Sequence, residues 1–91
     1  MNKNEISVTI KAQNGGTWPD AAFNIHQTVG HVLEKAIDHF HLDPHPAGGY
    51  EVLLAQNGSQ RSLDLAGTLT DDGVHTHDVL LVRTAGRTVD G

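Results

Sequence analysis

The chain has 91 residues and a formal net charge of −5, from six basic and eleven acidic side chains; its length suits a single domain with a small core. The charge argues against nucleic-acid binding, which requires clustered lysine and arginine, and without cysteine the chain has neither disulfides nor a thiolate metal site. It shows no secretion signal and no run near the ~20 apolar residues of a membrane helix, so we expect a cytoplasmic monomer that binds no membrane.

The first predicted element is a hairpin. Residues 6–10 alternate apolar and polar side chains, which is typical of a strand with one buried face. Asn14-Gly15 supplies the positive φ angles of a tight turn, and a second strand should return over residues 17–26. Pro19 cannot donate to a sheet ladder, so this strand should lie at an edge or contain a bulge. Its inward-facing residues should include Phe23 and Ile25.

One helix should follow the hairpin. Thr28 is a suitable N-cap, because its side-chain oxygen can accept a hydrogen bond from the first turn. Asp43-Pro44 ends the segment, since a residue before proline is disfavoured in the helical region. The apolar residues between them recur at helical spacing and form one stripe: Val29, Val32, Leu33, Ala36, Ile37 and Phe40.

The second half of the chain predicts three more strands. They cover residues 50–55, 60–63 and 79–83, and Asn57-Gly58 is the turn between the first two. The last strand is almost continuously apolar, which is typical of a central strand, so we expect it beside the first strand. Between residues 63 and 74 a capped turn should begin at Thr68 or Thr70. Its apolar anchors should be Leu63, Leu65, Leu69 and Val74.

This order predicts an α+β fold with a mixed four- to five-stranded sheet and one helix packed across it. At this point the chain resembles ubiquitin, through the helix opening at Thr28-Val29, the spacing Leu63-x5-Leu69-x4-Val74, and Leu69-Thr-Asp-Asp-Gly-Val74 followed by Asp78-Val-Leu. The resemblance implies a ubiquitin-like β-grasp domain over residues 1–83 and a flexible C-terminal tail over residues 84–91. β-Grasp domains serve several functions, so the function must be argued from the site.

The resemblance implies a protein modifier. An activating enzyme would adenylate the carboxyl group of Gly91, and a conjugating enzyme would pass it to target proteins; Arg83, Arg87 and Asp90 would be recognised along the tail. Glycine suits this chemistry because its backbone can approach an enzyme closely. Ubiquitin-like modifiers usually end in two glycines, whereas this chain ends Val-Asp-Gly and has seven histidines. It therefore resembles most the divergent bacterial modifiers encoded beside activating, conjugating and JAB-type peptidase partners.

A second candidate site is an apolar patch on the sheet. If Val79 and Leu81 faced the helix, the patch on the other face would contain Leu53, Leu80 and Val82. Three apolar side chains clustered on an exposed sheet face indicate a partner-binding surface. Ubiquitin's main recognition patch lies in the same place.

Other functions stay open or are disfavoured. The chain could instead be a non-conjugated β-grasp interaction module, like the small ubiquitin-like component of type VII secretion systems, or a sulfur carrier with a terminal thiocarboxylate. We expect no enzyme activity, because the serines lack a nucleophile motif and no phosphate-binding loop is present. We expect no metal or cofactor, because the histidines near residues 39–45 and at 75 and 77 lack a complete ligand set.

Overall fold

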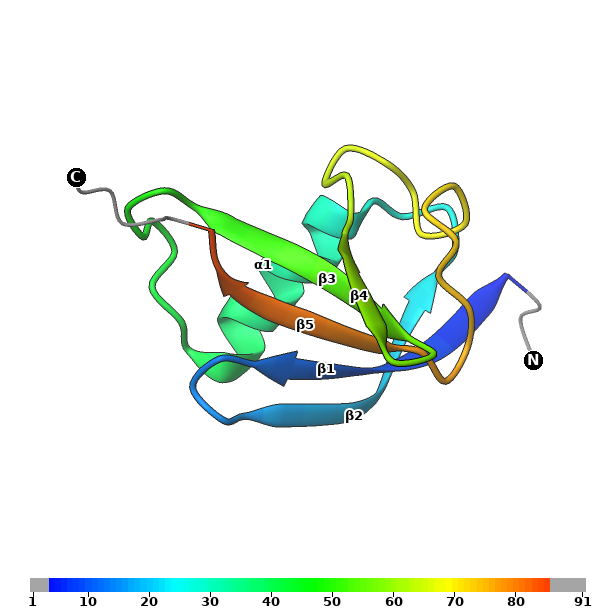
Figure 1. Cartoon of the computed structure of the whole chain (residues 1–91), viewed down its shortest axis with the longest axis horizontal. Helices are drawn as coiled ribbons and strands as arrows, with labels where there is room; N and C mark the ends of the chain where they lie inside the picture. Colours follow the sequence, from blue (N-terminus) through cyan, green and yellow to red (C-terminus); the bar gives the residue numbers. More distant parts are fainter. Residues whose placement is uncertain (1–3, 86–91) are drawn as a thin grey trace.

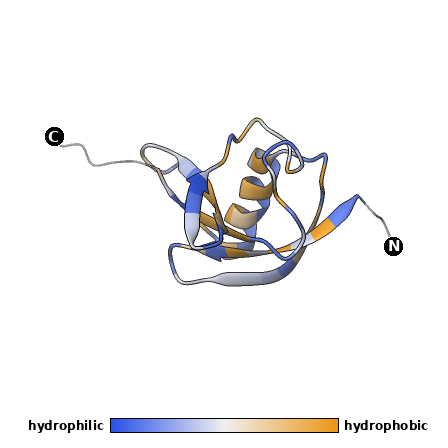
Figure 2. Ribbon diagram, turned by 45° about the vertical axis from the view of Figure 1, so that its right-hand side comes forward, coloured by the Kyte–Doolittle hydropathy of each residue, from blue (hydrophilic) through white to orange (hydrophobic). Residues whose placement is uncertain are grey.

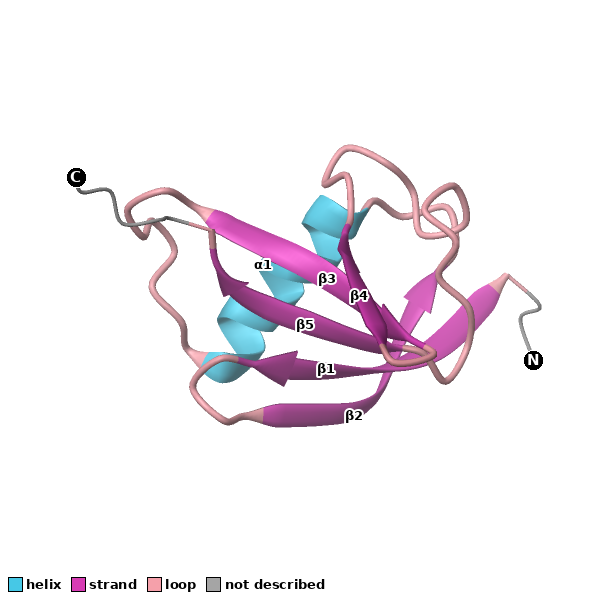
Figure 3. Cartoon of the chain, viewed as in Figure 1, coloured by secondary structure: helices cyan, strands magenta, loops and turns pink. Residues whose placement is uncertain are grey.

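The computed structural model describes residues 4–85. One helix crosses one face of a five-stranded sheet whose strand order is β2-β1-β5-β3-β4 (Figures 1 and 3). This arrangement confirms the predicted α+β, β-grasp fold. In chain order the elements are β1 (Glu5–Ala12), β2 (Thr17–Asn24), α1 (Val29–Phe40), β3 (Tyr50–Gln56), β4 (Ser59–Ser62) and β5 (Val79–Thr84).

The last strand, β5, is the centre of the sheet, as its continuous apolar sequence predicts. It runs parallel to β1, with Leu80 beside Ile10, and antiparallel to β3, with Leu80 beside Leu54. It includes Thr84, one residue beyond the predicted end. β3 therefore holds β5 in register along its whole length, and β1 holds it over residues 79–82.

The edge strand β2 carries the irregularity that its proline predicts. The register of β1 against β2 shifts between Val8 and Ile10, and Asp20, directly after Pro19, has a φ of 57°. A bulge on an edge strand discourages pairing with other chains. Phe23 points into the core, but β2 ends at Asn24, and Ile25 is only half-buried because the chain there turns toward the helix.

Helix α1 begins and ends with identifiable caps. Thr28 Oγ1 accepts a hydrogen bond from the His31 N–H at 3.1 Å, as the sequence predicts. His41 closes the helix in the left-handed region, with a φ of 56°. The segment before Thr68 covers the start of the helix, because the Gly30 N–H donates to the Leu65 carbonyl at 2.9 Å. No helix in the described part of the chain is long and apolar enough to cross a membrane.

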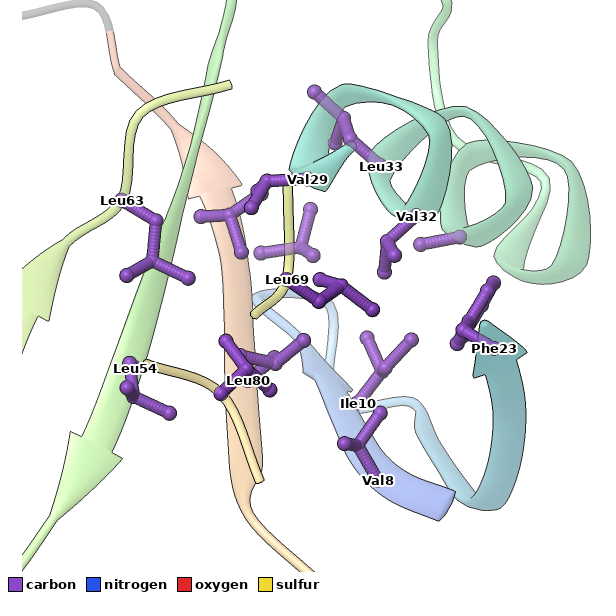
Figure 4. Close-up of a cluster of buried hydrophobic side chains, with 14 of the residues drawn as sticks. Val8, Ile10, Phe23, Val29, Val32, Leu33, Leu54, Leu63, Leu69 and Leu80 are labelled. Atoms are coloured by element: carbon purple, nitrogen blue, oxygen red, sulfur yellow. The ribbon is translucent and has the colours of Figure 1, made fainter. Parts of the chain in front are cut away.

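The core lies between α1 and the sheet. Figure 2 shows apolar stretches on α1 and on the strands that it faces, and Figure 4 shows their side chains meeting around Leu69 and Leu80. Leu63, Leu69 and Val74 are buried, as predicted, whereas the expected anchor Leu65 is exposed. The buried cluster comprises Val8, Ile10, Ala21, Phe23, Val29, Val32, Leu33, Ala36, Val52, Leu54, Leu63, Leu69, Val74, Leu80 and Val82.

Candidate functional site

The predicted patch on the outer face of the sheet is wrong for two of its three residues. Leu80 and Val82 are 0% and 1% exposed and belong to the core. Each lies opposite an inward-facing residue of β3, Leu80 opposite Leu54 and Val82 opposite Val52, and residues paired across a sheet share a face. In a run of four apolar residues, no alternation of apolar and polar side chains shows which two are buried. A shift of the strand register by one residue exchanges the two faces.

The outer face carries Leu53, Leu81 and Val79 instead, which we call the outer strip. Leu53 lies opposite Leu81 on β5, and Val79 lies opposite Ala55. Leu81 and Val79 are half-buried; Leu53 is only 6% exposed, although it is outside the core cluster. On the other side of β5, the exposed Lys11 lies beside Leu81. The strip is therefore a narrow apolar surface rather than a deep pocket.

Arg83 belongs to this face and not to a tail. Its Nε donates to Glu51 Oε2 at 2.6 Å, and the two side chains are 50% and 28% exposed. An exposed ion pair of this kind contributes little to stability, typically about 0–1 kcal/mol, so the Arg83 side chain can exchange Glu51 for another carboxylate at small cost. The other predicted tail residues, Arg87, Asp90 and Gly91, lie outside the described residues.

The end of β5 is fixed from both sides. The Thr84 N–H donates to Gln13 Oε1 at 2.7 Å, and the Ala85 N–H donates to the Gly49 carbonyl at 2.9 Å. The β1–β2 turn and the loop before β3 therefore both contact the end of β5, and Figure 1 shows both at that end of the sheet. The fixed part of the chain reaches Ala85, beyond the boundary predicted after Arg83. An exposed glutamine in a turn gives no sequence signal of this role, and sequence reasoning missed Gln13.

The loop before β3 is itself anchored close to this point. The Tyr50 hydroxyl donates to the Asp43 carbonyl at 2.6 Å, and Tyr50 pairs with Thr84 across the sheet. Burial, and to a smaller extent the charge of Asp43, raise the pKa of the Tyr50 hydroxyl above its ordinary value of 10.0. The hydroxyl therefore remains a hydrogen-bond donor at neutral pH and ties the two ends of the loop together.

The histidines lie at separate places. His39 stacks on Trp18 with ring centroids 4.1 Å apart and planes 7° apart, and the edge of His31 meets Phe23. His75 and His77 lie in the loop before β5, as predicted. Within residues 4–85, no group of three or more histidine or acidic side chains is placed to hold a metal ion.

Comparison with known proteins shows the fold alone. No protein-family profile matches the chain, and no curated protein matches its sequence. Among solved structures, a de novo designed protein based on ubiquitin has a TM-score of 0.73 at 18% identity, covering 99% of this chain and 100% of its own. Tubulin-binding cofactor B of Trypanosoma brucei has a TM-score of 0.74 at 15% identity, covering 92% and 99%. The C-terminal ubiquitin-like domain of mouse tubulin-specific chaperone e also reaches 0.74, at 18% identity, covering 96% and 93%.

Proposed function

We propose that this chain is a ubiquitin-like protein modifier of a bacterial type, conjugated to target proteins through Gly91. One observation supports the proposal above others: hydrogen bonds from two loops hold β5, the central strand, as far as Ala85. Ala85, from which the chain continues toward Gly91, is therefore held in a fixed position on the domain. A defined starting point suits a substrate whose reactive group must enter an enzyme while the enzyme holds the domain.

The chemistry would take place at the carboxylate of Gly91. One of its oxygens attacks the α-phosphorus of ATP, and pyrophosphate leaves. A cysteine thiolate of the activating enzyme then attacks the acyl adenylate and releases AMP. The acyl group passes to a thiol of the conjugating enzyme, and finally to an amine of the target with loss of that thiol. A JAB-type peptidase would release the modifier, or expose Gly91 if the natural protein continues beyond it.

The outer strip gives the enzymes a surface to hold. Leu81 and Val79 offer apolar contact area at the middle of the sheet, and the Arg83–Glu51 pair borders it with charge. Apolar contact with a polar border is the usual composition of a specific interface. Arg83 would orient the chain toward Gly91, and the activating enzyme would recognise Arg87 and Asp90 between these two residues.

Gly91 deletion tests the proposal. We would express an N-terminally tagged chain in its host, isolate the tagged species and sequence the linked peptides by mass spectrometry. The expected result is a set of heavier adducts joined through the Gly91 carbonyl, lost on deletion of Gly91 and kept in the Ser59→Ala variant, which alters an exposed residue of β4. Adducts that persist without Gly91 would refute the proposal.

A second candidate is a non-conjugated interaction module that acts through the outer strip. The observation that favours it is the apolar pairing of Leu53 with Leu81 on the face away from the helix. In that case Leu81→Asp abolishes capture of the partner from host lysate, and truncation after Ala85 leaves it intact. For the modifier, truncation after Ala85 would instead abolish conjugate formation. A sulfur carrier would show itself by intact mass, because sulfur in place of oxygen at the C-terminus adds about 16 mass units.

A further inference from the structure

We propose that Gln13 is a positioning residue, which fixes the point and direction from which the chain leaves β5 toward Gly91. This inference rests on the proposed function. Gln13 lies on the first hairpin, far from the chain end in sequence, yet it would help to present the carboxyl group.

The backbone ladder between β1 and β5 ends at Gln13. Its last backbone bond runs from the Gln13 N–H to the Val82 carbonyl at 3.1 Å. The next donor along β5 is the Thr84 N–H, but β1 ends at Ala12 and the chain turns away there into the hairpin. The Gln13 side chain supplies the missing acceptor through its Oε1, 2.7 Å from the Thr84 nitrogen. Gln13 therefore forms hydrogen bonds with two successive backbone groups on this side of β5, the Val82 carbonyl and the Thr84 N–H.

On the opposite side of β5, the chain end is held by Gly49. The Gly49 carbonyl accepts from the Ala85 N–H at 2.9 Å, and Gly49 has a φ of 73°, a conformation that favours glycine. Gln13 and Gly49 thus hold two consecutive amides from opposite directions. We call this pair of contacts the exit clamp.

The distance that the carboxyl group can reach depends on where the chain leaves the sheet. From Ala85 to Gly91 there are six residues, which extend at most about 20 Å. Opening the exit clamp would free Thr84 and Ala85 and lengthen the span by about 7 Å. A looser and longer connection lowers the effective concentration of the carboxyl group at an enzyme that already holds the domain. The clamp therefore strengthens the overall binding of the modifier to an enzyme that contacts both the domain and the carboxyl group.

A purely structural role for Gln13 is disfavoured by its surroundings. The side chain is exposed and lies outside the core cluster. Its loss leaves no buried polar group, because the hydrogen bond from the Thr84 N–H to Gln13 is itself exposed. Substitution should thus change the exit of the chain without unfolding the domain.

The first experiment measures the clamp itself by amide hydrogen exchange of the full chain, followed by NMR. In Gln13→Leu we expect the Thr84 and Ala85 amides to exchange about tenfold faster, with the Leu80 amide unchanged. Gln13→Glu keeps an acceptor oxygen and should exchange like the wild type. Gln60→Leu makes the same change at an exposed glutamine of the far edge strand, β4, and serves as the matched control. Unchanged exchange in Gln13→Leu would overturn the clamp.

The second experiment measures the consequence of the clamp by ATP–pyrophosphate exchange with the candidate activating enzyme of the host. Gln13→Leu should raise KM about three- to tenfold and leave kcat unchanged, since preorganisation acts on binding, whereas Gln13→Glu and Gln60→Leu should match the wild type. Faster amide exchange with an unchanged KM would overturn the positioning role while the proposed function stands. No pyrophosphate exchange with the wild-type chain would instead overturn the proposed function, and the positioning role with it.

Discussion

Among single residues, Asp72 shows the clearest conflict between its charge and its surroundings. Its Oδ2 is buried without a hydrogen-bond partner and lies against the backbone of Gly67. Burial raises the pKa of the Asp72 carboxyl above its ordinary value of 3.8; the charges of Asp64 and Asp71 raise it further, and Arg61 opposes them. A carboxyl with a raised folded-state pKa favours folding below its unfolded pKa and loses that contribution as the pH rises through the folded-state pKa.

We therefore predict that Asp72→Asn stabilises the domain at neutral pH, by about 0.5 kcal/mol or less because solvent screens the charge. The gain should shrink as the pH falls below 3.8, where Asp72 is mostly protonated in both states. Urea unfolding at pH 7 and pH 3.5 measures the difference, with Asp20→Asn on the exposed hairpin as control. An equal gain at both pH values would show that the charge is not its cause.

His41 carries backbone strain at the end of α1. Its φ of 56° places a residue with a Cβ in the left-handed region, which costs about 1–2 kcal/mol relative to glycine. We predict that His41→Gly raises the free energy of unfolding by about 0.5–1 kcal/mol. Lys35→Gly, an exposed position inside the helix, should lower it by about 1 kcal/mol. Guanidinium unfolding compares the two variants, and a loss in His41→Gly would mean that its side chain contributes to folding.

Among the elements, β5 decides which residues are available to partners. Leu80 is fully buried and Leu81 is half-buried on the opposite face. We predict that Leu80→Ala lowers the free energy of unfolding by about 2–5 kcal/mol, and that Leu81→Ala lowers it by less than about 1 kcal/mol. Urea titration of both variants gives the comparison. Equal losses would contradict the register of β5 against β3.

The same strand shows what can be predicted from sequence. The helix can be predicted from its N-cap and from the helical spacing of its apolar residues. The central position of β5 can be predicted from its continuous apolar sequence. The face on which Leu80 and Val82 lie cannot be predicted in this way, because it depends on their pairing with Leu54 and Val52 of β3, far earlier in the chain. The exit clamp does not follow either, since it joins Gln13 to Thr84 through a contact that no local pattern encodes.

For the whole molecule, the core of the described residues and the proposed chemistry are located in different parts of the chain. Every residue of the core cluster lies between Val8 and Val82, and the last described hydrogen bond from the chain end is that of Ala85. A modifier benefits from this separation, because enzymes can handle its carboxyl group without unfolding the domain. The outer strip and the exit clamp both lie on the domain side of the division, where the sheet fixes their geometry.

This separation gives the last prediction. A chain truncated after Ala85 should keep its free energy of unfolding within about 0.5 kcal/mol of the full-length value, yet form no conjugate. Truncation after Val82 should lower it by about 1–2 kcal/mol, because the Thr84 and Ala85 hydrogen bonds and the Arg83–Glu51 pair are lost together. Urea unfolding and the host conjugation assay measure both properties on the same three proteins. A large loss of stability on removal of residues 86–91 would contradict the division of the chain, because it would give those residues a part in holding the fold.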